Sequence, residues 1–295
     1  MISILIPTFN YDVSQLVESL HAQAIQLDGP FEIVVYDDHS TKPVAANEAI
    51  GALPNAQFTM LPNNIGRSAI RNKLAHDAKY ENLLFLDADT QVEHATFLQL
   101  YLNALSPTTE IIYGGIKYQP QPPAQDELLR WKYGTQREAL PVAERRKEAH
   151  LRFLTLNFLI KKSVFEKIQF NEAIPNLRHE DTLFALDCKK KGISVAHIDN
   201  PVIHLGLESS SVFLRKSRES VEALHLFVSE GLIQAEETAL SKKAHQLEKL
   251  KLTAPVAAFY RLFRRKMEHN LLSNDPSLLI FDVYRLGYYL SITTR

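Results

Sequence analysis

Two acidic residues, Asp87 and Asp89, directly follow an uninterrupted apolar run at residues 83–86. A run of this length between helical patterns predicts a parallel strand that is buried on both faces. Ligands of such sheets lie beyond the carboxyl ends of the strands, where these two carboxylates stand. Carboxylates separated by one residue can bind a hard cation such as magnesium or manganese. The alternative is an ordinary acidic turn, because Asp is common in turns.

Short polar clusters also follow the three earlier predicted strands. These clusters are Thr8 and Asn10 after residues 2–6, Asp37 and Asp38 after residues 32–36, and Asn64 and Gly66 after residues 58–61. Loops at the carboxyl edge of a parallel sheet face one crevice, so these distant segments are expected to line a single site. Their convergence favours a ligand site more strongly than any one cluster does.

Two pairs of charged residues add further chemistry. Arg67 and Arg71 lie one turn apart on a predicted helix, where a guanidinium suits a phosphate or carboxylate partner, and Arg67 is expected to be the more exposed. Glu180 and Asp181 open another predicted helix. Acids there either cap the helix or supply a general base.

Helical periodicity between the predicted strands indicates the fold class. Apolar residues recur at helical spacing after residue 13, over 67–77 and over 96–105, and a further strand is expected at 111–113. This alternation predicts an α/β fold with a mostly parallel sheet flanked by helices. After residue 208 the periodicity is only helical, over segments 211–230, 235–250, 256–270 and 277–291. We therefore expect two domains, 1–208 with the sheet and 209–295 as a C-terminal helical extension.

Composition and charge narrow the class of protein. The 295 residues suffice for one large or two modest domains, and the formal net charge of -1 argues against nucleic acid as a partner. Cys188 is the single cysteine, which favours a reducing compartment. The first residues are interpreted as a strand rather than a signal peptide, and no apolar segment of about 18 residues predicts a membrane span. These features predict a cytoplasmic protein.

Six motifs, taken in order, resemble those of the inverting glycosyltransferases of family 2, bacterial type. They are ISILIPTFN, EIVVYDDHS, NNIGRSAIRN, FLDADT, TLNFLIKKSVFEKI and HED, within residues 1–205. The resemblance implies the GT-A fold and transfer of a sugar, with inversion, from a nucleotide-sugar donor, with a UDP-sugar favoured. It implies a glycan or lipid-linked glycan acceptor and a role in cell-surface polysaccharide or glycolipid synthesis.

The resemblance assigns the donor contacts mainly to the loops at the sheet edge. The residues that it implies in donor binding are Pro7, Thr8, Asn10, Asp37, Asp38, Asn64, Gly66, Arg67, Arg71, Asp87, Ala88 and Asn157. Asp37 and Asp38 match the position that accepts hydrogen bonds from the base, and Asp38 is favoured as the direct contact. Asn157 lies in a strand that flanks the donor sugar in the family, although a buried Asn can also serve only backbone groups.

The resemblance also implies the metal and the catalytic base. The segment 87–89 matches the DxD element, which implies Mn²⁺ or Mg²⁺ with Asp87, Asp89 and His204 as candidate ligands. Ligation by His204 and a structural role for it are both kept open. Asp181 matches the general base, and Glu180 is expected to bind acceptor hydroxyls or to orient the helix. His179 stands where the family often has an aromatic residue or glycine.

The C-terminal quarter contains a basic segment. Between residues 242 and 266 the Lys and Arg residues are 242, 243, 249, 251, 261, 264, 265 and 266, against one acid, Glu248. Such a segment predicts either peripheral contact with the inner face of the cytoplasmic membrane or a packed helix with a solvated basic face. The last helix carries Phe281, Tyr284, Tyr288 and Tyr289. It is expected to cover the acceptor site or to form a homodimer interface.

Two other functions are weighed against glycosyl transfer. LLFLDADT also resembles the nucleophile motif of haloacid-dehalogenase-type phosphatases, but here it lies on the fourth predicted strand instead of near the start of the chain. A non-catalytic nucleotide-binding relative with the same fold is the second alternative. The presence of both acid pairs disfavours it.

Overall fold

The computed structural model describes residues 1–174 and 178–293, which form two compact units. The first unit comprises Met1–Tyr118, Ala139–Asn176 and Glu180–Gly206, and the second comprises Gln119–Glu138, Leu177–His179 and Leu207–Arg295. The expected division into domains at residue 208 stays a prediction, because compact units do not by themselves show which parts fold alone.

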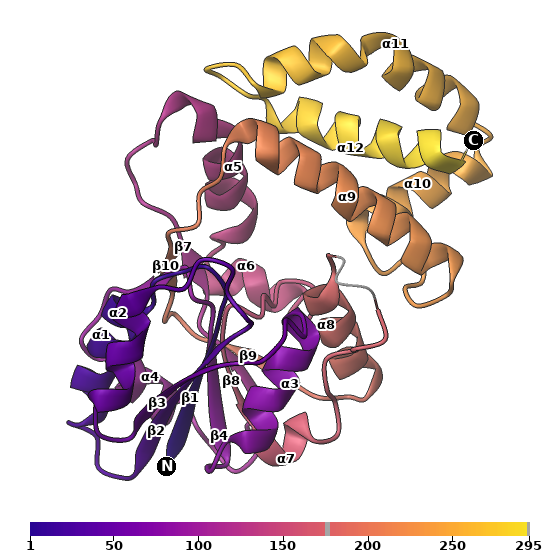
Figure 1. Ribbon diagram of the computed structural model, residues 1–295. Coiled ribbons are helices and arrows are strands. Elements are labelled where there is room, and N and C mark those ends of the chain that lie inside the picture. Colours follow the sequence, from indigo (N-terminus) through magenta and orange to yellow (C-terminus); the bar gives the residue numbers. More distant parts are fainter. Residues whose placement is uncertain (175–177, 294–295) are drawn as a thin grey trace. The chain divides into compact units, whose positions relative to one another are not determined.

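A seven-stranded sheet forms the centre of the first unit (Figure 1). In spatial order its strands are β3 (Ala56–Met60), β2 (Phe31–Asp37), β1 (Ile2–Thr8), β4 (Asn82–Leu86), β8 (Asn157–Lys161), β6 (Ile111–Tyr113) and β9 (Val195–His197). Neighbouring strands are parallel except at β8, which is antiparallel to β4 and β6. The expected α/β fold with a mostly parallel sheet is therefore confirmed.

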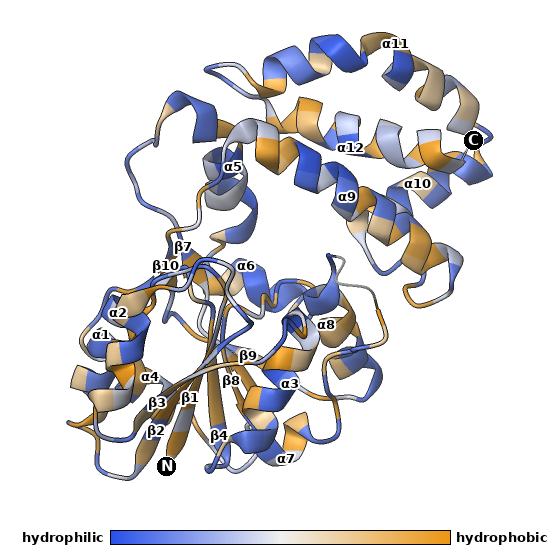
Figure 2. Ribbon diagram, in the orientation of Figure 1, coloured by the Kyte–Doolittle hydropathy of each residue, from blue (hydrophilic) through white to orange (hydrophobic). Residues whose placement is uncertain are grey.

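Helices cover both faces of this sheet. On one face, Leu83 and Phe85 of β4 belong to a core with residues of α3 (Arg67–Asp77), α7 (Lys162–Phe165) and α8 (Glu180–Lys190). Figure 1 shows α1 (Ser14–Ala24), α2 (Ala45–Glu48) and α4 (Phe97–Asn103) on the other side. The alternate residues Leu84 and Leu86 are also fully buried. Figure 2 shows the hydrophobic residues gathered along these central strands. The unit also has a 3-10 turn, Ala49–Ala52, and α6 (Val142–Lys147).

A second, three-stranded sheet was not predicted in full. Its order is β5 (Thr90–Val92), β10 (Val202–His204) and β7 (Ile116–Lys117), with β10 antiparallel to β5 and parallel to β7. Only the strand near residues 202–203 was expected. Strands of two or three residues are too short to show a period-two pattern, so β5 and β7 carry no signal in the sequence.

Asn157 is a buried structural residue rather than a surface group that faces a ligand. Its side chain is fully buried, its Oδ1 accepts a hydrogen bond from Tyr101 Oη at 2.7 Å, and its Nδ2 donates to Gly115 O at 2.9 Å and Asn200 O at 3.0 Å. This burial argues against the predicted donor contact. The amide instead joins β8 to the Gly114–Gly115 turn, as a buried Asn must when it satisfies backbone groups.

The second unit is helical. It contains a 3-10 turn (Gln125–Glu127), α5 (Leu128–Tyr133), a π turn (Gly134–Glu138), α9 (Ser210–Ser229), α10 (Ala239–Lys249), α11 (Thr253–Leu271) and α12 (Leu278–Thr293). The four helical segments expected after residue 208 are therefore present. None of the helices in the described part of the chain is both long and apolar enough to cross a membrane.

The aromatic residues of α12 pack inside the second unit. Phe281 and Tyr284 are almost fully buried in a core with Tyr260 of α11. A Cβ added at Gly287 would lie 2.6 Å from Tyr260 Cβ, so only glycine permits this close approach of α11 and α12. Helix packing thus explains the apolar character of α12, and the expected roles in covering the acceptor site or in dimerisation stay predictions.

We predict that Asn157→Ala lowers the free energy of unfolding by about 2–4 kcal/mol, because it removes one hydrogen bond each from buried groups of Tyr101, Gly115 and Asn200. Urea denaturation followed by circular dichroism measures the change. The control Asn103→Ala, at an exposed position of α4, should change it by about 0.5 kcal/mol or less. Equal losses in the two variants would contradict the structural role of Asn157.

Candidate active site

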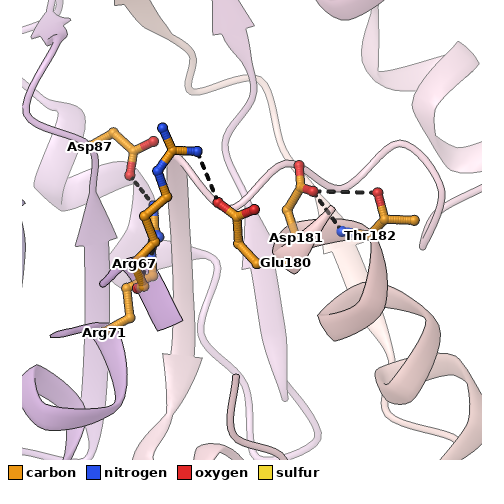
Figure 3. A network of polar contacts seen from close by, with 6 residues as sticks. All are labelled: Arg67, Arg71, Asp87, Glu180, Asp181 and Thr182. Carbon is orange, nitrogen blue, oxygen red and sulfur yellow. Dashed lines mark hydrogen bonds and ion pairs between the residues drawn. The ribbon is translucent and has the colours of Figure 1, made fainter. Parts of the chain in front are cut away.

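A partly buried ion pair joins α3 to Asp87, the first acid that follows β4. Arg71 Nη2 donates to Asp87 Oδ1 at 2.7 Å, and the guanidinium lies 5.5 Å from the centre of the Phe170 ring. The Arg71 side chain is 8% exposed and the Asp87 side chain 33%. Burial alone lowers the pKa of Arg71, but the nearby carboxylates of Asp87 and Glu180 outweigh it and raise this pKa. Arg71 is therefore a fixed positive charge at the sheet edge (Figure 3).

Arg67, one turn earlier, is the more exposed arginine, as predicted. Its side chain is 55% exposed, and its Nη1 lies 3.3 Å from Glu180 Oε1 at the start of α8. An ion pair of this length with one exposed partner contributes little to stability. It does, however, hold the Glu180 carboxylate on the side of Arg67, as Figure 3 shows.

Asp181 is partly buried and has an unusual protonation equilibrium. Burial, and then the negative charge of Glu180, raise its pKa to about 6. The backbone N–H of Thr182 donates to Asp181 Oδ1 at 2.7 Å, and this bond together with the charge of Arg71 opposes the increase. A carboxyl group with a pKa of about 6 is ionised at neutral pH and still basic enough to accept a proton.

The second acid of the DxD segment has a different partner. Asp89 Oδ2 lies 3.4 Å from His204 Nε2, because β10 pairs with β5 and places His204 opposite Thr90. The N–H of Leu205 donates to Asp89 O at 2.8 Å and holds the two segments together. A Cβ added at Gly206 would lie 2.1 Å from Asp89 Oδ2, so this glycine leaves the room that the carboxylate occupies.

These residues offer part of a metal site. A carboxylate oxygen and an imidazole nitrogen side by side suit Mn²⁺, and oxygen atoms of a bound ligand would complete the coordination. Among the described residues, no three His, Cys, Asp or Glu side chains gather as a metal site. Asp87, predicted as a further ligand, is instead paired with Arg71. The donor set of Asp89 and His204 fits a cation that is shared with a ligand.

The loops after β2 and β3 are tied together by Asp38. Its two carboxylate oxygens accept the N–H groups of Ile65 at 2.7 Å and Gly66 at 3.0 Å, immediately before α3. Asn64 Nδ2 donates to Asp38 O at 2.9 Å. Gly66 has φ 85°, a value that favours glycine. Asp38 thus fixes the start of the helix that carries Arg71, and its predicted contact with a base stays a prediction.

The loops after β1 and β2 are connected in the same way. Asp37 Oδ1 accepts the N–H of Ser40 at 2.6 Å, and Ser40 Oγ accepts the N–H of Asn10 at 2.6 Å. Thr8 is buried and Pro7 is partly exposed. The expectation that these polar segments come together at one sheet edge agrees with these contacts, whereas their binding of a donor stays a prediction.

Sequence reasoning missed several residues near this edge. Phe9, between Thr8 and Asn10, is 46% exposed, although large apolar side chains are usually buried. Tyr11 and Asp12 line a pocket of about 400 Å³, together with Ala88, which lies between the two acids of the DxD segment. An exposed aromatic residue in a loop was the available signal for Phe9. The pocket had no signal, because it depends on the unpredicted strand β5.

Comparisons with solved structures show the same fold in other proteins. The mannosyltransferase PcManGT from Pyrobaculum calidifontis, in complex with GDP-Man and Mn²⁺, has a TM-score of 0.60 at 15% identity, over 99% of this chain and 85% of that one. TarS 1–349 from S. aureus has a TM-score of 0.51 at 18% identity, over 100% and 92%. Glucosyl-3-phosphoglycerate synthase from Mycobacterium tuberculosis, with Mn²⁺, UDP and glucosyl-3-phosphoglycerate, has a TM-score of 0.51 at 14% identity, over 76% and 78%. At such identities the likeness shows the fold alone.

No sequence among the curated proteins matches the chain. The sequence model of the family described as Glycosyl transferase family 2, in contrast, matches residues 3–171, which is more than half of the chain. This match leaves no support for the phosphatase alternative. With its α/β GT-A fold and C-terminal helices, the chain belongs to glycosyl transferase family 2.

Proposed function

We propose that the protein is a metal-dependent, inverting glycosyltransferase that moves a sugar from a nucleotide-diphosphate sugar to an acceptor hydroxyl. The observation that carries the proposal is the cluster of Asp87, Glu180 and Asp181 around the buried Arg71 guanidinium (Figure 3). Within it, Asp87 is fixed by an ion pair, whereas Asp181 has a pKa raised to about 6. A fixed anchor beside a basic carboxylate is what positioning and proton removal require.

The donor is proposed to lie along the loops that Asp38 and Asp37 tie together. These loops bring Thr8, Asn10 and the Asn64–Gly66 turn to the edge where Asp87 and Arg71 stand. Solved relatives support a nucleotide sugar, since their complexes contain GDP-Man, UDP-GlcNAc or UDP. A UDP-sugar is favoured, because UDP or a UDP-sugar is present in the complexes of two of these three proteins.

Asp89 and His204 are proposed to hold Mn²⁺ or Mg²⁺. When bound, such a cation offsets the negative charge that develops on the leaving nucleotide diphosphate. The PcManGT and glucosyl-3-phosphoglycerate synthase complexes both contain Mn²⁺, which supports this choice. The chain's own contribution is to hold the carboxylate and the imidazole next to each other through the pairing of β5 with β10.

Asp181 is proposed as the general base. A hydroxyl becomes a strong nucleophile when its proton is removed during attack, and inversion needs that removal on the face opposite the leaving group. Glu180 keeps Asp181 basic, because its negative charge disfavours a second charge beside it. The acceptor is proposed to be a glycan or lipid-linked glycan, in the synthesis of cell-surface polysaccharide or glycolipid.

A lipid-linked acceptor fits a proposed membrane contact through α11. The inward face of this helix buries Ala257, Tyr260, Met267 and Leu271. On the opposite side Phe259 is 49% exposed and Leu262 is 76% exposed, with Arg265 and Lys266 within one turn. Apolar side chains flanked by basic ones suit an anionic lipid surface, where each basic residue contributes about 1 kcal/mol.

Asp181→Asn tests the base. We expect nucleotide binding to be retained and the transfer rate to fall about 100-fold or more, because Asn does not accept the proton. The wild-type rate should rise with pH through about 6, since only ionised Asp181 is a base. Transferase assays across pH measure both. Full activity in Asp181→Asn would remove the base assignment and point to another base. Nucleotide binding without any transfer in the wild type would instead favour a non-catalytic nucleotide-binding relative.

The same group makes a stability prediction. The folded-state pKa of Asp181 is raised from 3.8 to about 6, so the folded state binds the proton more tightly than the unfolded state. The contribution to stability is therefore present at low pH and is lost as pH rises through about 6. Asp181→Asn should raise the free energy of unfolding by about 1–3 kcal/mol at pH 8 and should leave it unchanged at about pH 3.5. Asp187→Asn, on the same helix, should not show this difference.

Asp89→Asn tests the metal site without any turnover. Thermal shifts are measured with UDP, GDP, CDP and dTDP, each with and without Mn²⁺. A nucleotide should raise the melting temperature of the wild type only when Mn²⁺ is present, and the variant should lose this increase. The charge-neutral amide is a weaker ligand for a hard cation than a carboxylate. The control Glu93→Gln, at an exposed acid paired with Lys117, should keep the increase. Nucleotide binding by the wild type that is independent of Mn²⁺ would refute the metal proposal.

Vesicle flotation tests the membrane contact. Wild-type protein should float with vesicles of phosphatidylglycerol and phosphatidylcholine, and should stay at the bottom with phosphatidylcholine alone. Phe259→Ser with Leu262→Ser should abolish flotation. Leu279→Ser is the control, because Leu279 is 72% exposed but lies on α12 between the acids Asp275 and Asp282. Protein that stays at the bottom with anionic vesicles would end this part of the proposal.

A further inference from the structure

A pocket of about 400 Å³ lies between α1 and β5 in the first unit. One wall is the amino-terminal half of α1, which contributes Gln15, Leu16 and Ser19. The other wall is β5, the edge strand of the three-stranded sheet, with Leu205 after β10. The volume falls within the range of small-molecule sites, about 300–1,000 Å³. None of the donor or catalytic residues proposed above is needed to form it except Ala88.

The polar lining consists mainly of neutral hydrogen-bonding groups. Tyr11, Gln15, Ser19 and Gln91 present a phenol, two amides and a hydroxyl. In the described part of the chain, none of these four side chains is hydrogen-bonded to another residue. By contrast, Asn47, Asn72 and Asn157 in the same unit use their amides within the fold. The pocket groups are therefore free to exchange water for the hydroxyl groups of a ligand.

The charge of the lining excludes several ligand classes. Among the described residues that line it, only Tyr11 and Asp12 have ionisable side chains, and Asp12 already accepts hydrogen bonds from Ser14 at the start of α1. The described lining contains no Lys or Arg, which disfavours phosphate and nucleotide groups. A wholly apolar ligand would leave the amides and hydroxyls without partners. A neutral ligand with many hydroxyl groups and some apolar surface remains.

We infer that this pocket is a saccharide subsite, in which Gln15, Ser19 and Gln91 bind hydroxyl groups and Leu16, Val92 and Leu205 contact the C–H surface of the ring. The identity of the ligand as a sugar rests on the proposed glycosyl transfer. The pocket is mixed in the way that small-molecule sites are, with apolar walls and a few converging polar groups that set specificity.

The pocket adjoins the DxD segment. Ala88 and Thr90, on either side of Asp89, both line it. Tyr11 also lines the pocket, and its pKa is raised by burial and then by the charges of Asp89 and Asp12. A saccharide here is therefore next to the proposed metal site, as either the sugar of the donor or a ring of the acceptor glycan.

Saturation-transfer difference NMR with methyl glycosides of glucose, galactose, mannose and N-acetylglucosamine, and with their disaccharides, tests the inference. Ser19→Trp should fill the pocket and abolish the saturation-transfer signal of the saccharides. Its matched control is Glu18→Trp, because Glu18 is exposed on the same helix and does not line the pocket. The double variant Gln15→Ala with Gln91→Ala should raise the Kd for the saccharide about tenfold or more. Both positions are exposed, so the substitutions should leave folding intact.

Competition experiments show whether the bound saccharide corresponds to the donor sugar or to the acceptor glycan. Competition by UDP-glucose with Mn²⁺, but not by UDP with Mn²⁺, would assign the subsite to the donor sugar, and absence of competition would assign it to the acceptor. No saccharide signal in the wild type, or a signal that Ser19→Trp leaves intact, would overturn the inference. Failure of the proposed function is distinguishable, because it appears as a missing Mn²⁺-dependent thermal shift with nucleotides in the wild type.

Discussion

The buried guanidinium of Arg71 is the constraint on which the geometry of the site depends. A charge with 8% exposure must have a partner, because its desolvation is otherwise uncompensated. Asp87 supplies that partner at 2.7 Å and so fixes the end of β4 against α3. The position of α3 is in turn set by Asp38, which binds the N–H groups of Ile65 and Gly66 just before the helix begins. The loops that follow three strands are thereby held in one arrangement.

The two acids of the DxD segment serve different halves of the site. Asp87 follows the last residue of β4 and pairs with Arg71, whereas Asp89 lies immediately before β5 and next to His204 of β10. One intervening residue, Ala88, is enough for this separation, because the chain changes from one sheet to the other at that point. A simple chelate of one cation by both acids does not describe the side chains as they lie. Asp87 pairs with Arg71, and on the proposed function Asp89 is the acid that would meet the cation.

Sequence reasoning predicted the large sheet because its signals are local. The run at 83–86, the polar residues after each early strand and the helical periodicity each reflect burial of neighbouring residues. Contacts across the sequence are different: the bonds from Ile65 and Gly66 to Asp38, the pairing of β5 with β10, and the enclosure of Asn157 all depend on tertiary structure. Asn157 does lie in a strand, β8, as the sequence predicted. Only the structure shows that its amide is used entirely within the fold.

The site contains more carboxylates than cationic side chains. Asp87, Asp89, Glu180 and Asp181 bring four carboxylates to one edge, and Arg71 is the buried cation among them. The raised pKa of Asp181 is one result, because burial and the neighbouring Glu180 both disfavour its ionised form. A diphosphate in such a place would meet more negative than positive charge, and like charges at close range repel strongly when they are partly removed from water. A divalent cation beside Asp89 and His204 would reverse that balance locally. On the proposed function, the same carboxylates that supply the base would therefore favour a cation beside the diphosphate.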